Sequence, residues 1–595
     1  MTDERERLKQ INSAPTRVHD GIDREALRRA LGTTPPAGED SKSSLDAGKT
    51  YSLKHAVNAP TQVPVRGGFT RAINTMLTAP ERETQLQITG EHVLLALLLA
   101  VIFFVRVTQL NYNTLYLDEA IYTTVGEDAL AGVLDQGATQ WMFGSYLYPV
   151  SAALANNVGG VFGLRALSAV LTTVAALFVY LTTQRLFGAH SALWALLIFG
   201  LSGISISLGQ QAVYDAMSVP FLAAALYFVV SAMCVPPRRR LFATLGSLTL
   251  TLAILAKYIA VMALPALVLA MVVLHFYQGG TLRNVWKSVP WLYFLLPMIG
   301  ILGAYGVYYF ADLQQVLTGQ FASQVEPRGD ILATIIGDLG LPLIFAAAGT
   351  LIILRGAPDH VAGERRLSRW FALALVAFFL AVLTMPLYHL VTSNIRALSK
   401  HNVYSLVFLA PLAGFAVTRL VEMLRTRRGQ QSTAGRAAGA LVTAVSLLLF
   451  VNTAFAQNQA FHASWPNNDG ELAFLRTQAI TPDSRVLSSG YAIFEYYYDF
   501  GVQDREVWNN VWYTEYNGAT GEEAIEQAVG DCAFDWIVLE NFYAPEWSGY
   551  LESVAYNAGY AVVYSEMEVL SDGTEIISVV LVPPEDGQCG NALAG

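Results

Sequence analysis

Two adjacent carboxylates, Asp118 and Glu119, follow directly on the first long apolar run of the chain. A carboxylate pair at the end of a membrane helix is either an ordinary solvated helix end or part of an active site. In an active site, such a group can take a proton from an acceptor hydroxyl, which is general-base catalysis. We take Asp118 and Glu119 as the leading catalytic candidates, with Asp215, at another helix end, as a third.

Basic side chains supply a second kind of chemistry, because a cation can hold and neutralise a departing phosphate. Taken singly, each is explained as a helix end, and Lys257 equally well as a snorkelling side chain. Both signs of charge gather at one predicted membrane face, however, and this favours a site. Asp338, at the same face, is interpreted as structural, and His389 alone indicates little. If the site transfers a group from a phosphate-containing donor, the candidates for binding that phosphate are Arg165, Lys257, Arg396, Lys400 and His401.

The composition places most of the chain in lipid. The protein has 595 residues, of which 53% are hydrophobic and 14% charged, whereas a soluble domain carries about 25% charge. The basic residues are scattered in short loops rather than gathered on one face, which argues against nucleic acid as a partner.

Eleven apolar runs are long enough for membrane helices, each of which needs about 20 apolar residues. The sequence therefore predicts a polytopic α-helical membrane protein, with a transmembrane domain over 89–460. A polar, largely disordered extension over 1–88 precedes it. The predicted spans are 91–110, 164–186, 190–208, 215–235, 241–257, 259–276, 288–311, 331–354, 369–391, 403–421 and 437–456.

The charges of the loops predict the orientation. Every second loop is basic, as at Arg238–Arg240, and loops rich in Lys and Arg lie in the cytoplasm. The N-terminus is then cytoplasmic, and residues 465–595 lie outside with 22 acidic side chains against 3 arginines and no lysine. We expect a multi-pass plasma-membrane protein whose first external loop, 111–163, carries two helices along the lipid interface, over 121–135 and 145–160.

Residues 465–595 alternate strand-like and helical runs, which predicts a compact extracytoplasmic α/β domain. Its many aromatic residues are interpreted mainly as core or as a surface packed on the membrane part, with stacking on sugar rings as the alternative. Cys532 and Cys589 could form a disulfide outside the cytoplasm, although spacing alone does not establish proximity. The expected strands are 484–489, 536–540, 561–569 and 576–582, and the expected helices 469–478, 521–530 and 547–557.

Several short motifs resemble those of the GT-C glycosyltransferases, and most closely the prokaryotic protein O-mannosyltransferases and aminoarabinose transferases. Leu117-Asp118-Glu119-Ala120 looks like the acidic motif that ends the first helix in that family. Gly163–Ser168 with its arginine looks like the start of the family's second helix. Phe187-Gly188 and Tyr214-Asp215 also match. The resemblance covers about 90–460 and extends to the plan of about eleven helices with an external C-terminal domain.

The resemblance implies an inverting transfer of a sugar, commonly mannose, from a polyprenyl-phosphate donor at the outer face of the membrane. Asp118 would be the catalytic base, and Glu119 would position it or bind a divalent cation. Asp215 would serve the acceptor site, and Arg165 would contact the phosphate or the framework. The loop 312–330 lies where the family has a mobile loop over the site, and it contains Gln320, Glu326, Arg328 and Asp330.

The sequence also departs from the family. Aminoarabinose transferases carry a Lys-Pro-Pro segment in the first external loop, whereas the comparable stretch here is Phe143–Pro149, without the lysine. This departure argues against lipid A as the acceptor and leaves donor-phosphate binding to other cations. The acceptor stays open between protein, glycan and lipid hydroxyls.

Other functions and cofactors remain open at this stage. A transporter or flippase of a lipid-linked substrate is the main alternative, and it predicts charges near the bilayer midplane and paired broken helices. A non-catalytic assembly protein on the same scaffold is a third interpretation. No cofactor is required by the pattern, and a divalent cation, if there is one, would be held by Glu119.

Overall fold

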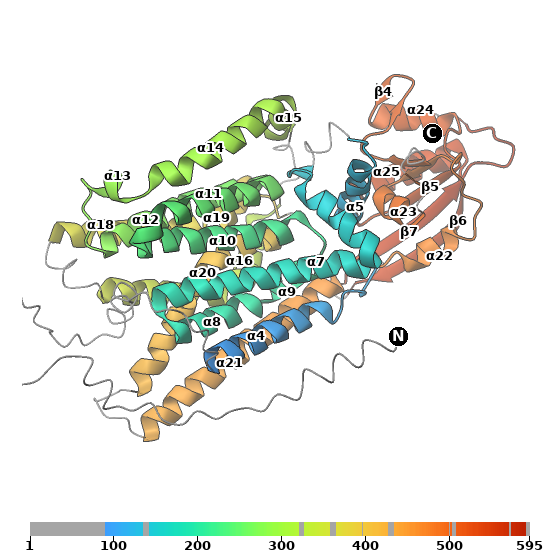
Figure 1. Ribbon diagram of the computed structural model, residues 1–595. Helices are drawn as coiled ribbons and strands as arrows, with labels where there is room; N and C mark the ends of the chain where they lie inside the picture. The colour runs from blue at the N-terminus through green and yellow to red at the C-terminus, as the bar shows by residue number, and fades with distance from the viewer. Residues whose placement is uncertain are drawn as a thin grey trace, which may run out of the picture. The chain divides into compact units, whose positions relative to one another are not determined.

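The computed structural model of the chain describes residues 90–134, 142–319, 326–356, 365–395, 397–425, 433–498, 500–501, 507–570 and 573–590. The predicted extension over 1–88 lies outside these residues. Helices make up the first part of the described chain, and all strands lie in its last part (Figure 1). This arrangement confirms the predicted class, a polytopic helical membrane protein with a C-terminal α/β domain.

Nine helices among the described residues are long and apolar enough to cross a membrane, and up to eleven spans result if each of two bent helix pairs is one span. An apolar run in lipid forms a helix because in a helix the backbone N–H and C=O groups of the segment are hydrogen-bonded to one another. The unbent spans are α4 (Gly90–Val107), α7 (Leu147–Phe187), α10 (Tyr214–Cys234), α11 (Arg239–Ala256) after η1 (Pro236–Arg238), α12 (Leu264–Tyr277) after η2 (Tyr258–Ala263), α14 (Trp291–Tyr308), α16 (Arg328–Arg355), α20 (Leu398–Arg425) and α21 (Thr433–Ala463). Two short helices, α13 (Val285–Ser288) and α15 (Phe310–Gly319), flank α14.

Two of the predicted straight spans are bent. The run 190–208 is divided into α8 (Ala189–Gly200) and α9 (Gly203–Gln210), which meet at 59°. The run 369–391 is divided into α18 (Arg365–Val382) and α19 (Thr384–Thr392), which meet at 53°. The apolar pattern continues through both breaks, so it predicts the length of each span but not its bend.

A buried arginine stabilises the first break. Arg106, near the end of α4, is fully buried. Its Nη1 donates to the carbonyl oxygen of Gly200 at 2.8 Å, and its Nη2 donates to Ser205 Oγ at 2.9 Å. One side chain therefore binds the last residue of α8 and the first turn of α9. Its Nε donates to Thr172 Oγ1 on α7 at 3.0 Å, which fixes the bend against a third helix.

The first external loop differs from the prediction in one respect. The helix expected over 121–135 is α5 (Leu117–Leu130). The helix expected over 145–160 is continuous with the second span in α7, with a break in helical backbone angles at Gly159 and Gly160. Gly160 has φ of 57°, a conformation that glycine adopts without strain, and it lets the helix change direction there.

Close helix packing at α20 depends on small residues. A Cβ at Gly414 would lie 2.5 Å from the carbonyl oxygen of Ser191 on α8, and a Cβ at Gly349 on α16 would lie 2.3 Å from that of Leu412. Small residues let membrane helices approach closely where no hydrophobic effect drives them together. α20 is therefore enclosed between α8 and α16, which fixes the residues at its start.

The C-terminal part forms a five-stranded sheet in the order β2-β1-β5-β7-β6. β1 is parallel to β2 and β5, and β7 is antiparallel to β5 and β6. The predicted strands and helices are all present, and α23 and three short strands are additional. The strands are β1 (Val486–Ser488), β2 (Trp508–Asn510), β5 (Trp536–Glu540), β6 (Ala561–Val569) and β7 (Glu575–Val582), beside the hairpin of β3 (Glu515–Tyr516) and β4 (Ala519–Thr520); the helices are α22 (Asp469–Leu475), α23 (Tyr491–Tyr498), α24 (Glu522–Gly530) and α25 (Pro545–Ala558).

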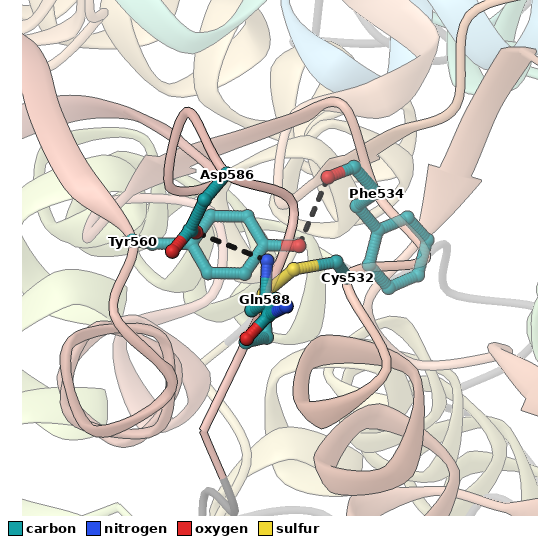
Figure 2. The surroundings of a disulfide bond; sticks show 6 residues. Cys532, Phe534, Tyr560, Asp586 and Gln588 are labelled. Atoms are coloured by element: carbon teal, nitrogen blue, oxygen red, sulfur yellow. Dashed lines mark hydrogen bonds between the residues drawn. A yellow bond between two sulfur atoms is a disulfide. The ribbon is translucent and has the colours of Figure 1, made fainter.

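A disulfide joins Cys532, just after α24, to Cys589 near the end of the chain, 57 positions away. Figure 2 shows its surroundings: Tyr560 Oη donates to the carbonyl oxygen of Phe534 at 2.9 Å, and the backbone N–H of Gln588 donates to Asp586 Oδ1 at 3.1 Å. The last segment of the described chain is thereby fixed to the core of the domain. Cys234, in α10, is the free cysteine.

Candidate active site

The site is built on the start of α5, which a carboxylate fixes in place. Tyr116 is the residue before the helix, and its backbone N–H donates to Glu119 Oε2 at 2.9 Å. Such an interaction satisfies a backbone donor that the first turn would leave unpaired. Acidic side chains are also favoured at this end by the helix dipole. The local sequence therefore determines where the helix begins and which carboxylate is turned inward.

Glu119 is fully buried and bound on both oxygens. Arg165 donates to Oε1 at 3.1 Å from Nε and to Oε2 at 2.8 Å from Nη2. The backbone N–H of Ala212 also donates to Oε1, at 2.7 Å. Glu119 therefore joins α5 to α7 and to the segment that precedes α10.

Arg165 has no donor left for a ligand. Its remaining N–H groups bind the carbonyl oxygens of Leu110, Asn113 and Thr114 at 2.6 to 3.1 Å. Its guanidinium lies 4.7 Å from the ring centroid of Trp465 and is 1% exposed. Of the two roles that the sequence left open, this geometry agrees with the framework contact and not with a phosphate contact.

Asp118 is the accessible member of the pair. Its side chain is 35% exposed, and Oδ2 accepts a hydrogen bond from Lys400 Nζ at 2.8 Å. Lys400 lies in the first turn of α20, and Nζ is 6.0 Å from the centroid of the Tyr116 ring. A carboxylate with an accessible side and an adjacent cation can act as a base beside a group that binds anions.

Asp215 is the centre of a buried second cluster. Tyr404 donates to Oδ1 at 3.0 Å, and His401 Nε2 lies 3.8 Å from the same oxygen. Lys257 Nζ lies 4.0 Å from Oδ2. Because Lys400 and His401 are adjacent on α20, this cluster and the Asp118–Lys400 pair form one continuous polar region.

The segment around Phe143 positions Lys257. The backbone N–H of Ser145 donates to the carbonyl oxygen of Leu255, and the N–H of Tyr258 donates to that of Phe143. Lys257 Nζ lies 5.7 and 5.5 Å from the ring centroids of Phe143 and Tyr214, within cation–π range. This is the stretch that was compared with the Lys-Pro-Pro segment of aminoarabinose transferases, and here it contacts Lys257, the residue that follows α11.

Two histidines extend the cluster behind Asp215. His389 Nδ1 lies 2.6 Å from the carbonyl oxygen of Asn394, so this nitrogen carries a proton and donates. His389 Nε2 then accepts from His401 Nδ1 at 2.7 Å. When His401 is neutral, its Nε2 directs a lone pair toward Asp215, and when it is charged, it directs an N–H there.

A cavity of about 570 Å³ lies beside Lys400, between α9, α16, α20 and α21. Its polar lining includes Lys400, Gln211 and Asp338, and Asp338 Oδ2 accepts from Asn402 at 2.9 Å. Tyr116 and Trp465 contribute aromatic surface. A mixed polar and apolar cavity of this size is typical of a ligand site.

The C-terminal domain packs on the segment that carries Asp118. Leu115 N–H donates to Tyr497 Oη at 3.1 Å, and Tyr496 Oη donates to Asn156 Oδ1 at 2.7 Å. The Tyr116 ring makes edge contacts with the ring of Tyr543 and with that of Phe542, which also lines the cavity. These aromatic side chains therefore have the packing role that the sequence favoured.

The other predicted site residues are less central. Glu326 N–H donates to the carbonyl oxygen of Ser393 at 2.8 Å, and Arg328 Nε donates to Ser393 Oγ at 3.4 Å. This fixes the end of the predicted mobile loop to the segment before α20. Gln320 and Arg396 lie outside the described residues.

The residues do not form a metal site around Glu119. Both of its oxygens accept hydrogen bonds from N–H groups, and Asp118 Oδ2 is paired with Lys400. In the described part of the chain, no group of three His, Cys, Asp or Glu residues is placed to hold a metal ion. We therefore derive no step through a metal at this position.

Sequence reasoning missed Tyr404 and Tyr116 as parts of the site. Tyr404 lies four positions after Lys400, so the two share one face of α20. Helical spacing from a candidate lysine is a signal that could have identified it. Tyr116 gave no such signal, because its role depends on aromatic partners far away in the chain.

The middle of the membrane part matches a known protein family. Residues 140–313 match the family described as Dolichyl-phosphate-mannose-protein mannosyltransferase, a range that includes Arg165, Asp215 and Lys257 but not Asp118 or Lys400. No curated protein matches the chain in sequence.

Solved structures that are similar to the chain include those of two proteins. ArnT from Cupriavidus metallidurans in the apo state has a TM-score of 0.53 at 15% identity, over 83% of this chain and 98% of that chain. The same protein bound to undecaprenyl phosphate has a TM-score of 0.50 at 16% identity, over 84% and 99%. The archaeal oligosaccharyltransferase AglB from Archaeoglobus fulgidus, in complex with an inhibitory peptide and a dolichol-phosphate, has a TM-score of 0.46 at 13% identity, over 83% and 76%.

Proposed function

The chain resembles the protein mannosyltransferases and has the GT-C fold of ArnT, and from this premise we propose that it is an integral-membrane glycosyltransferase. The proposed reaction is an inverting transfer of a sugar, mannose or a similar hexose, from a polyprenyl-phosphate donor to an acceptor hydroxyl. The observation that supports it most is the contact between Asp118 and Lys400, a base and a cation 2.8 Å apart beside a large cavity.

The reaction balances with two groups of the protein. Asp118 takes the proton of the acceptor hydroxyl, and the oxygen attacks the anomeric carbon of the donor sugar. A new carbon–oxygen bond forms as the bond between the sugar and the phosphate oxygen breaks, and one displacement inverts the anomeric centre. The polyprenyl phosphate leaves with an additional negative charge.

Cations at the site neutralise that charge. Lys400 is 20% exposed, so its ammonium can leave Asp118 for a phosphate oxygen once the donor binds. Lys257 is more deeply buried and pairs with Asp215. We assign Lys400 to the phosphate, Lys257 and Asp215 to the shape of the acceptor side, and Glu119 and Arg165 to the framework.

The acceptor site is proposed to face the outside of the cell. The net negative charge of 465–595 and the disulfide of Cys532 and Cys589 both agree with an oxidising, extracytoplasmic compartment. The acceptor hydroxyl belongs to a protein, a glycan or a lipid that reaches the membrane surface there. The cavity between the spans and the C-terminal domain would admit the acceptor or the donor.

The first experiment measures sugar transfer in membranes that contain the full chain, with radiolabelled polyprenyl-phosphate mannose. Asp118→Asn keeps the size of the side chain and removes its basicity, so transfer is expected to fall by about 10²- to 10⁴-fold. Asp483→Asn, the same change at an exposed position of the C-terminal domain, is the matched control and should transfer normally. Undiminished transfer by Asp118→Asn would remove this carboxylate from the mechanism.

One observation favours the flippase alternative. The breaks between α8 and α9 and between α18 and α19 are the broken spans that a transporter predicts. The movement of a lipid-linked sugar across the bilayer is therefore measured in the same membranes. Flux without transfer, unchanged in Asp118→Asn, would favour the flippase over the transferase.

A further inference from the structure

A second polar cavity, of about 300 Å³, lies between the last turns of α7 and α10. Arg185, Gln184, Tyr227 and Cys234 are among its lining residues. Arg185 follows Arg165 on the same helix by 20 positions, or about 30 Å at 1.5 Å per residue. The cavity is therefore at the end of the membrane domain opposite to the candidate active site.

The charge of Arg185 has no anionic partner in the described part of the chain. Nη2 makes one long hydrogen bond to Tyr227 Oη at 3.4 Å, and Nη1 is buried without a hydrogen-bond partner. The guanidinium lies 5.2 Å from the ring centroid of Tyr227 and 6.0 Å from that of Phe242. A partly buried cation in this state is stabilised by any anion that reaches it.

The chain that follows the cavity adds more positive charge. Arg238, Arg239 and Arg240 follow the lining residue Val235 after two prolines, and none of them forms an ion pair with a described residue. Arg239 Nη1 donates to the carbonyl oxygen of Ser288, while its Nε is buried without a partner. The cavity thus contains one cation without an ion pair, and the chain that leaves it carries three more that form no ion pair with a described residue.

We propose that this cavity binds the phosphate group of an anionic membrane lipid. The ends of α7 and α10 lie where spans leave the apolar layer, which is the depth of lipid headgroups. The guanidinium presents paired N–H donors to phosphate, and Gln184 adds an amide. Leu181 and the Tyr227 ring supply apolar surface beside these donors for the lipid's glycerol and chains. A free phosphate ion would use the donors but not the apolar surface.

Cys234 provides a direct readout, because it lines the cavity and is the one cysteine outside the disulfide. The purified full chain is placed in vesicles of phosphatidylcholine, with or without phosphatidylglycerol. The alkylation rate of Cys234 by N-ethylmaleimide, an uncharged reagent, is followed by mass spectrometry. When nine-tenths of the sites are occupied, phosphatidylglycerol should slow the reaction about tenfold.

The variants identify the cation responsible. Arg185→Gln should lose the protection, and Arg185→Lys should keep part of it. Arg283→Gln, which removes an exposed charge between α12 and α13 at the same end, is the matched control and should be protected like the wild type. Each rate is compared with and without phosphatidylglycerol in the same variant, so a change in the baseline reactivity of Cys234 does not imitate the result. The thermal unfolding of Arg185→Gln is measured beside that of the wild type, so that a misfolded variant is recognised.

Three outcomes would overturn the proposal. The first is an equal Cys234 rate in both vesicles for the wild type. The second is full protection of Arg185→Gln by phosphatidylglycerol. The third is protection by inorganic phosphate in phosphatidylcholine vesicles equal to that by the lipid, which would make the ligand a soluble phosphate. Protection by the lipid alone, lost in Arg185→Gln, supports the lipid site, and it does so whether or not the protein transfers sugar.

Discussion

Asp118 and Glu119 are neighbours in the chain with opposite surroundings. Asp118 is accessible and has one bond to a flexible lysine, whereas Glu119 is buried with four N–H donors on its two oxygens. A base must exchange protons with a substrate, and a framework anion must keep its partners. This contrast supports the proposal that Asp118 is the base and that Glu119 positions the start of α5.

Lys400 gives the first prediction at the scale of single residues. If it neutralises the leaving phosphate, Lys400→Gln lowers kcat/KM for the donor by about 10²- to 10³-fold, the effect of losing one charge-stabilising donor. Lys400→Arg, which keeps the charge, should retain part of the activity. The measurement is initial transfer rate against donor concentration, with Arg476→Gln as a control on an exposed arginine. Equal kcat/KM for Lys400→Gln and the control would exclude this role.

Arg165 gives the second prediction. Arg165→Gln leaves Glu119 buried without its cation, which should lower the free energy of unfolding by about 3–5 kcal/mol. Thermal unfolding of the purified full chain measures this loss. The double variant Glu119→Gln/Arg165→Gln should lose less than the sum of the single changes, because the unpaired charge is gone. If Arg165→Gln unfolds like the wild type but needs far more donor, Arg165 would be a phosphate contact after all.

The sequence could identify the acidic pair but not the difference between its members. Adjacent carboxylates at a helix end give the same sequence signal. The side chains that make their surroundings differ are far away in the chain: Lys400 is 282 positions from Asp118, and Arg165 is 46 positions from Glu119. Helical spacing predicts which residues share a face of one helix. It contains no information on which two faces meet.

At the scale of elements, two buried glutamates lie beside the contact between the C-terminal domain and the segment before α5. Glu471 on α22 and Glu540 on β5 are 1% and 2% exposed, and Asn468 Nδ2 donates to both. Asn468 N–H also donates to Thr114 Oγ1, four positions before Asp118. Burial and mutual repulsion raise the pKa of Glu471, and burial raises the pKa of Glu540 to about 8.

The third prediction concerns this pair. A carboxyl group whose pKa is raised on folding binds its proton more tightly in the folded state, so its contribution to stability is complete below the unfolded value of 4.5 and is lost as the pH rises through about 8. Thermal unfolding of the full chain should occur at lower temperature near pH 9 than near pH 6. Glu540→Gln should reduce this difference, since an amide stays neutral, and Glu575→Gln at the exposed first position of β7 should not. An alkaline loss of equal size in Glu540→Gln would assign it to other groups.

The elements that the sequence predicted best are those determined by local composition. Each span needs its own apolar residues, so all eleven runs could be found in the sequence. The longer strands could be found too, because each has its own β-rich run of residues. The bends after Gly200 and Val382 were missed because the prediction counted only apolar residues. Pro386 lies four positions after Val382, whose carbonyl oxygen accepts from Ser405 Oγ instead, and the first bend has Gly200 and Gly203 beside the contacts of Arg106. α23 was missed because its sequence, Tyr491–Tyr498, is mostly aromatic and its packing is with α5.

At the scale of the whole molecule, the two functional regions proposed here lie at opposite ends of the membrane domain. The carboxylates and Lys400 are under the C-terminal domain, and the Arg185 cavity is at the far ends of α7 and α10. The loop charges predict which end faces the cytoplasm: the acidic domain with its disulfide faces outward, and the arginine-rich end faces inward. Sugar transfer and lipid binding would then take place at different faces of the membrane.

The native cysteines test this orientation. Cys532→Ser releases Cys589, which is partly exposed near the end of the chain. A membrane-impermeant maleimide added to intact cells should label Cys589 in this variant and should reach Cys234 only after permeabilisation, because the two thiols are on opposite sides of the membrane. The wild type, with Cys589 in its disulfide, is the control for the first label, and Cys234→Ser is the control for the second. Labelling of Cys234 but not Cys589 in intact cells would invert the topology and place the Asp118 site in the cytoplasm, where a disulfide and an outward-facing acceptor would both be out of place.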